Sequence, residues 1–201
     1  MKHVILAVVL LAVLGGVALL VVGLWAVSVN NSLVRADQEV NEKWAQVQNV
    51  YQRRADLIPN LVETVKGFAA QERGVLTDVT NARARATGVQ LTPEALSDPQ
   101  AMQRFQAVQG QLTGALSRLM VTVERYPELK SNQNFLSLQS QLEGTENRIT
   151  VERRRYNEAV KDYNTRVSLF PGRLVASFVG YKPKAYFEAE AGAATAPKVK
   201  F

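Results

Sequence analysis

The residue types that carry most enzyme chemistry are scarce in this sequence. The chain has no cysteine and a single histidine, His3, which lies at the start of a long apolar run. It therefore offers neither a cysteine nucleophile nor the Glu-x-x-His pairs with which helical bundles hold di-iron centres. The patterns of common hydrolases, zinc proteases and phosphate-binding loops are missing as well. We expect no catalytic residue, no metal ligand and no cofactor, and a protein that is not an enzyme.

Three charged residues are the best candidates for a buried polar site. Arg54 falls on the apolar stripe of a first long helix, and Glu152 falls on the stripe of the last one, with Glu146 six residues before it. A lone buried charge costs several kcal/mol, so a buried arginine needs a partner. The sequence predicts that Arg54 meets Glu152 or Glu146 across a bundle and that the pair sets helix register. A ligand-binding or proton-handling site is the alternative interpretation.

The helix that carries Arg54 is predicted from apolar residues that recur three and four positions apart, from Leu33 to Ala86. Such a stripe is typical of coiled coils and helical bundles. Unbroken, at about 1.5 Å per residue, this helix would be roughly 80 Å long. Pro59 disturbs it, because proline lacks an N–H and its ring clashes with the carbonyl of Ala55. We expect a kink at Pro59, with a reversal of the chain as the alternative.

Two further helices are predicted, over residues 100–125 and from residues 131–133 to the break at Phe170-Pro171-Gly172. Short connections make neighbouring helices antiparallel. The expected fold is therefore all-α: an N-terminal transmembrane helix, then an antiparallel three- to four-helix bundle whose long first helix is kinked or broken at Pro59. A short helix and an extended segment follow, to residue 187. Residues 188–201 are mostly alanine, glycine and charged residues, which predicts a flexible tail.

An uncharged run from Val4 to Val29 is long enough to cross a hydrocarbon layer of about 30 Å. A cleavable signal peptide is the alternative, but its apolar part is usually only about 7 to 15 residues. We interpret residues 1–29 as a membrane anchor and residues 30–187 as the bundle domain. Ala12, Gly16 and Gly23 share one face of the anchor, where small residues let another helix approach closely. Glycine is also simply common in membrane helices, which is the other interpretation.

Several motifs occur in the order found in a known family, over roughly residues 1–188. They are Asn31-Ser32-Leu33-Val34, Trp44-Ala45-Gln46-Val47, the run from Arg53 to Phe68, Ala82-Arg83, Tyr126-Pro127-Glu128-Leu129-Lys130, Glu146-Asn147-Arg148-Ile149, Tyr156-Asn157 and Tyr186-Phe187-Glu188. In these motifs the chain resembles the LemA family of bacterial membrane-anchored helical-bundle proteins. The resemblance implies a single-pass protein of the bacterial inner membrane with its bundle on the extracytoplasmic side, in a family without an established biochemical activity.

The sequence thus predicts a membrane-anchored helical scaffold or interaction module that self-associates. Its expected partners are the lipid bilayer, further copies of the chain and another membrane protein. Nucleic acid is not expected, because the net charge of +6 is modest and basic residues are interleaved with acidic ones. One alternative is an envelope sensor with a ligand cavity near Arg54 and Glu152 lined by Tyr51, Tyr156 and Tyr163. The other is a lipid-binding or membrane-remodelling protein that acts through residues 170–187.

Overall fold

The structure is a computed structural model that describes residues 1–188, without the side chains of residues 2–5, 7 and 8. Its elements, in chain order, are α1 (Lys2–Phe68), α2 (Arg73–Gly88), the 3₁₀ helix η1 (Glu94–Ser97), α3 (Pro99–Val123), α4 (Pro127–Lys130), α5 (Gln133–Ser168) and α6 (Gly172–Val179). The prediction of an all-α helical bundle with a long N-terminal apolar helix is confirmed. The tail predicted to be flexible lies, apart from Glu188, outside the described residues.

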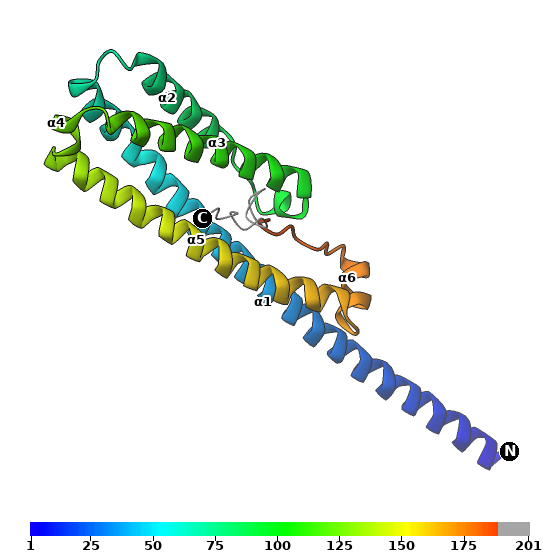
Figure 1. The fold of residues 1–201 in the computed structure, drawn as a ribbon. Helices are drawn as coiled ribbons and strands as arrows, with labels where there is room; N and C mark the ends of the chain where they lie inside the picture. The colour runs from blue at the N-terminus through cyan, green and yellow to red at the C-terminus, as the bar shows by residue number, and fades with distance from the viewer. Residues whose placement is uncertain (189–201) are drawn as a thin grey trace, which may run out of the picture.

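Helix α1, with 67 residues, runs along the whole length of the molecule (Figure 1). Helix α5 runs antiparallel along it, and α2 and α3 pack as an antiparallel pair against the end of α1 that is far from the N-terminus. The first part of α1 projects beyond the bundle (Figure 1). This projecting part is long and apolar enough to cross a membrane, and its apolar window is not buried against any described part of the chain.

The chain reverses at residues 69–72, and this differs from the sequence prediction. We expected one helix up to Ala86, kinked or broken at Pro59. The structure instead carries α1 through Pro59 without interruption, ends it at Phe68 and starts α2 at Arg73. The apolar repeat continues after the reversal because α2 also buries one face. That face includes Leu76 and Val79 and packs against α1 and α3.

Helix α1 tolerates Pro59 because α2 supplies the missing hydrogen bond. Proline leaves the carbonyl four residues earlier without its helical donor, and that carbonyl belongs to Ala55, which is buried. Arg83 of α2 donates from Nε to the Ala55 carbonyl oxygen over 2.7 Å. Arg83 of α2 is therefore bound to the carbonyl that the proline leaves without a helical donor.

Two apolar clusters fill the interior. The proximal core, nearer the projecting part of α1, is built around Trp44 by residues from α1, η1, α3, α5, α6 and the C-terminal segment. The distal core, at the far end, includes Leu61 of α1, Leu119 of α3 and Phe135 of α5. Polar residues lie between these two clusters.

Candidate functional site

Arg54 is the most deeply buried charge in the described part of the chain, with 1% of its surface exposed. On α1 it lies between Tyr51, the last residue of the proximal core, and Ile58, the first of the distal core. The same interruption occurs on α3, where Gln109 separates Phe105 from Leu112. A polar layer therefore crosses the bundle between its two apolar clusters.

The guanidinium of Arg54 joins three helices. Its Nη2 donates to Gln109 Oε1 over 2.5 Å, and its Nη1 donates to Thr113 Oγ1 over 3.1 Å, both on α3. Nη1 also lies 2.8 Å from Glu146 Oε1 on α5. Gln109 extends the network, because its Nε2 donates to the carbonyl of Ala86 near the end of α2 over 3.2 Å. All four long helices thus meet at this level.

The structure brings Arg54 and Glu146 together but not Arg54 and Glu152. Glu152 pairs with Arg155 on its own helix over 2.8 Å. Its other oxygen, Oε2, is buried without a hydrogen-bond partner among the described residues. The two partners of the Arg54–Glu146 pair differ in burial: the arginine side chain is 2% exposed and the glutamate side chain is 41% exposed. One partner is buried and the other is in contact with solvent.

A cleft of about 400 Å³ opens beside this pair. It is lined from α1, α3 and α5 by residues that include Tyr51, Arg54, Thr113, Glu146 and Arg153. The ring of Tyr51 lies 5.1 Å from the guanidinium carbon of Arg54, a cation–π contact. The cleft fits the sequence prediction of a cavity near Arg54 only in part.

Two of the three tyrosines expected to line that cavity lie elsewhere, and so does Glu152, near which the cavity was expected. Glu152, Tyr156 and Tyr163 are not part of the cleft wall. Both tyrosines are buried in the proximal core. The prediction was wrong for them because it read their position on the apolar stripe as facing a cavity, whereas the C-terminal segment fills that space.

The chemistry available at Arg54 is fixed positive charge. A guanidinium has five N–H donors and no acceptor, so this side chain can only donate hydrogen bonds to the layer. Its two terminal nitrogens are already used by Gln109, Thr113 and Glu146, and only Nε lacks a partner among the described residues. The arrangement favours holding helices together over capturing a free anion.

An extended segment after α6 borders the cleft with its last residue, Glu188. The backbone N–H of Glu188 donates to Gln106 Oε1 over 3.1 Å, and its carbonyl accepts from Arg153 Nη2 over 3.0 Å. Earlier in this segment Ala185 N–H donates to the carbonyl of Leu96 in η1 over 2.8 Å. We call residues 182–188 the strap, because they tie η1, α3 and α5 together.

Helix α5 holds the strap with a repeated pair of side chains. Asn164 both donates to the carbonyl of Lys184 over 2.9 Å and accepts from its N–H over 2.8 Å. One heptad earlier, Asn157 does the same for Phe187, over 3.0 and 2.9 Å. The two preceding tyrosines each donate to a strap carbonyl, Tyr163 to Lys182 over 3.1 Å and Tyr156 to Ala185 over 3.0 Å.

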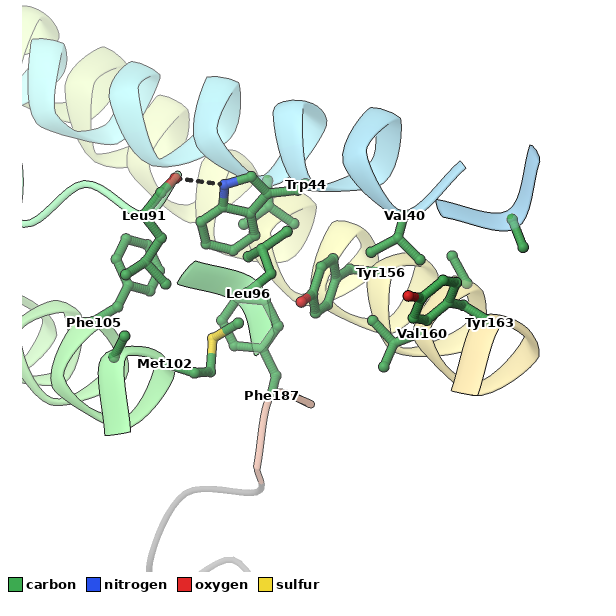
Figure 2. Packing of buried hydrophobic residues seen from close by; sticks show 14 of the residues in the cluster. Val40, Trp44, Leu91, Leu96, Met102, Phe105, Tyr156, Val160, Tyr163 and Phe187 are labelled. Atoms are coloured by element: carbon green, nitrogen blue, oxygen red, sulfur yellow. Dashed lines mark hydrogen bonds between the residues drawn. The ribbon is translucent and has the colours of Figure 1, made fainter. Parts of the chain in front are cut away.

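Phe187 completes an aromatic cluster around Trp44 (Figure 2). Its ring centroid lies 5.4 to 6.4 Å from those of Tyr156, Trp44 and Phe105. Trp44 Nε1 donates to the carbonyl of Leu91 over 3.2 Å, so the one polar atom of the indole is satisfied. The sequence analysis expected an extended segment here but did not place Phe187 in the core. The repeated Tyr-Asn pair was the signal available for it.

Burial raises the pKa of Tyr156 and Tyr163, the two tyrosines of α5 that donate to strap carbonyls. Desolvation raises the pKa of Tyr156 well above its usual value, and it raises the pKa of Tyr163 to about 12, with the charge of Asp37 acting in the same direction. Both phenols therefore remain neutral donors to the strap carbonyls at physiological pH. In the described part of the chain no three His, Cys, Asp or Glu residues gather as a metal site would require.

The predicted packing face of the anchor is open in the single chain. Apart from the backbone of their own helix, Gly16 and Gly23 have nothing within 4 Å of where a Cβ would stand, and Ala12 is exposed. No described part of the chain covers Ala12, Gly16 and Gly23, so their packing against another helix stays a prediction.

Comparison with known proteins gives one match. The model described as "LemA family" matches residues 43–201, which include Arg54, Glu146 and the whole strap. A search of curated proteins finds no match to the chain.

Proposed function

We propose, from the premise that the chain belongs to the LemA family, that it is a single-pass membrane-anchored interaction module whose activity is contact with other proteins and not catalysis. In this proposal the anchor crosses the bacterial inner membrane and the bundle stands on the extracytoplasmic side. Its partners are other copies of the chain and another membrane protein.

The observation that carries this proposal is the continuity of α1. One helix runs from Lys2 to Phe68, so the apolar part and the bundle share a backbone without a flexible joint. Any rotation or tilt of the anchor is therefore transmitted to the bundle. The layer at Arg54 supports the same role, because a hydrogen-bonded charge shared by several helices fixes their register. The module is built to present one rigid surface.

Self-association is supported by the open small-residue face of the anchor. Without a hydrophobic driving force inside a bilayer, helices associate through close packing, which small residues permit. Anchoring also concentrates the chains in two dimensions, so weak contacts become effective. The face of Ala12, Gly16 and Gly23 is where the proposal places the contact between copies.

The test is the mass of the full-length protein in a mild detergent, measured by light scattering. We expect an oligomer that Gly16→Leu or Ala12→Leu reduces to a smaller species. Ala18→Leu is the matched control, because Ala18 lies on the opposite face of the same helix. A monomeric unmodified chain would refute self-association, and an oligomer equally sensitive to Ala18→Leu would refute the assigned face.

A further inference from the structure

The end of the bundle nearest the anchor exposes a group of large apolar side chains. Phe178 is 91% exposed and Phe170 is 74% exposed, and Leu169, Leu174 and Val179 are each at least half exposed. Leu174 and Phe178 are four residues apart on α6, so they share one helix face. We call these five residues the apolar tip. A cluster of this kind on a protein surface usually marks a contact with a partner or a membrane.

Helix α6 cannot turn to bury the tip. Its opposite face is fixed by Gly172 and Ala176, which are buried against the bundle. A Cβ added at Gly172 would stand 2.0 Å from the carbonyl oxygen of Arg166, so the α6 backbone is already in close contact with the end of α5. The strap holds the other end. The tip therefore faces outward as a fixed feature of the fold.

The tip lies beside the anchor, at the depth of its last turn. The rings of Phe170 and Trp25 are 6.0 Å apart, and Leu169 and Phe170 line a shallow groove together with Val29. Trp25 precedes Val29, the last residue of the uncharged run, by four positions, or about 6 Å along the helix. If α1 spans a bilayer, the turn before α6 must reach the boundary between headgroups and acyl chains.

The charges around the tip suit that boundary. Residues 163–187 contain four basic residues and no acidic one. Arg173 on α6 and Lys182 just after it are exposed, while Lys184 is buried and paired with Asp37 over 2.9 Å. Aromatic and aliphatic side chains flanked by arginine and lysine are the composition of helices that lie in a membrane interface.

We propose that the apolar tip inserts into the leaflet from which α1 emerges. The bundle then contacts the membrane at the anchor and at the tip, which fixes its orientation relative to the bilayer. This inference rests on the anchoring part of the proposed function. A bilayer is favoured over a second copy of the chain as the occupant because the tip adjoins the spanning helix itself. With Trp25 and Phe170 in contact, lipid that surrounds the anchor also surrounds the tip.

The experiment uses single-cysteine spin labels, since the chain has no cysteine of its own. Phe170→Cys and Phe178→Cys report the tip. Val121→Cys and Leu136→Cys are matched controls, because both are exposed apolar residues near the distal end of the bundle. Leu14→Cys reports the anchor. The labelled full-length chains are reconstituted in vesicles of phosphatidylcholine and phosphatidylglycerol, and the accessibility of each label to oxygen and to a water-soluble nickel chelate is compared.

We expect the tip labels to favour oxygen, as the label at residue 14 does, and the two control labels to favour the nickel chelate. Tip labels that favour nickel while the label at residue 14 favours oxygen would overturn tip insertion and leave the anchor intact. A label at residue 14 that favours nickel would overturn the anchor, and tip insertion with it. An oxygen preference at the tip that disappears when the protein-to-lipid ratio is lowered would assign the tip to a second copy instead.

Discussion

Arg83 and Pro59 provide the sharpest test of how this bundle is assembled. Replacing Arg83 by alanine removes the donor to the Ala55 carbonyl, which Pro59 has already deprived of its helical partner. A buried acceptor left without a donor costs about 1–3 kcal/mol. We therefore expect Arg83→Ala to lower the free energy of unfolding by about 2 kcal/mol, a large effect for a half-buried arginine.

The same substitution should cost much less when Pro59 is replaced by alanine. Residue 59 then has an N–H directed at the Ala55 carbonyl, so the carbonyl keeps a partner when Arg83 is removed. Only the packing of the arginine stem is lost, for which we expect about 0.5 kcal/mol, the scale of an ordinary surface substitution. The difference between the two backgrounds predicts a coupling free energy of about 1.5 kcal/mol between Arg83 and Pro59.

The assay is urea unfolding in detergent, followed by far-ultraviolet circular dichroism. It compares four full-length proteins: the unmodified chain, Arg83→Ala, Pro59→Ala and the double variant. Arg85→Ala is the control, because Arg85 lies two residues along α2 and is exposed. It should cost little and show no coupling to Pro59→Ala. If Arg83→Ala is equally costly in both backgrounds, the hydrogen bond to Ala55 does not compensate for the proline and this account of α1 is wrong.

Three further predictions concern the layer and the strap. Phe187→Ala should lower the free energy of unfolding by about 3–5 kcal/mol, because Phe187 is buried. Its exposed neighbour gives the control, since Tyr186→Ala should cost under about 1 kcal/mol. Equal urea midpoints for the two variants would exclude Phe187 from the core. Arg54→Ala should cost about 3 kcal/mol or more because it removes the donor shared by Gln109, Thr113 and Glu146 at a buried site. Glu146→Gln should cost less, about 1–3 kcal/mol, because the amide keeps a hydrogen-bond acceptor while the buried guanidinium loses its counter-charge. The reverse order in urea unfolding would contradict the assigned burial. The folded-state pKa of Tyr163 is raised to about 12, so its contribution to stability is full below pH about 10 and is lost as pH rises toward 12. Unfolding midpoints across this range should show that loss, and Tyr163→Phe should reduce it; an unchanged pH dependence would count against the raised pKa.

The part of the site that sequence predicted is the part that obeys a helical repeat. Arg54 is a charge on an apolar stripe, and burial of that stripe implies a partner on a facing helix. The structure places Glu146 in that position, at 2.8 Å. Gln109 and Thr113 were not predicted, because a glutamine or threonine in a helix is unremarkable until its neighbours are known. Choosing between Glu146 and Glu152 also required the register of α5 relative to α1. The apolar repeat of each helix alone does not give that register.

The reversal at residues 69–72 was missed for a physical reason. Residues 69–72 contain no proline or glycine, and the glycines that flank them, Gly67 and Gly74, lie within the apolar repeat that was read as one helix. Pro59, the residue that does carry a breaking signal, stays helical because Arg83 replaces the lost donor from 24 positions away in sequence. Local propensity was overridden by a tertiary contact at Pro59, and at residues 69–72 it was weaker than the continuous apolar repeat. An apolar stripe records which face is buried and not whether the helix that carries it is continuous.

The strap shows a signal that a sequence does carry once the geometry is understood. Seven residues of α5 advance about 10.5 Å along the helix axis, and three residues of extended chain advance about 10 Å. Two asparagines one heptad apart therefore meet the backbone of residues three apart, as Asn164 and Asn157 meet Lys184 and Phe187. A helix with paired Tyr-Asn at this spacing is expected to hold an extended segment by its backbone, and the aromatic residue at the end of that segment is then expected in the core.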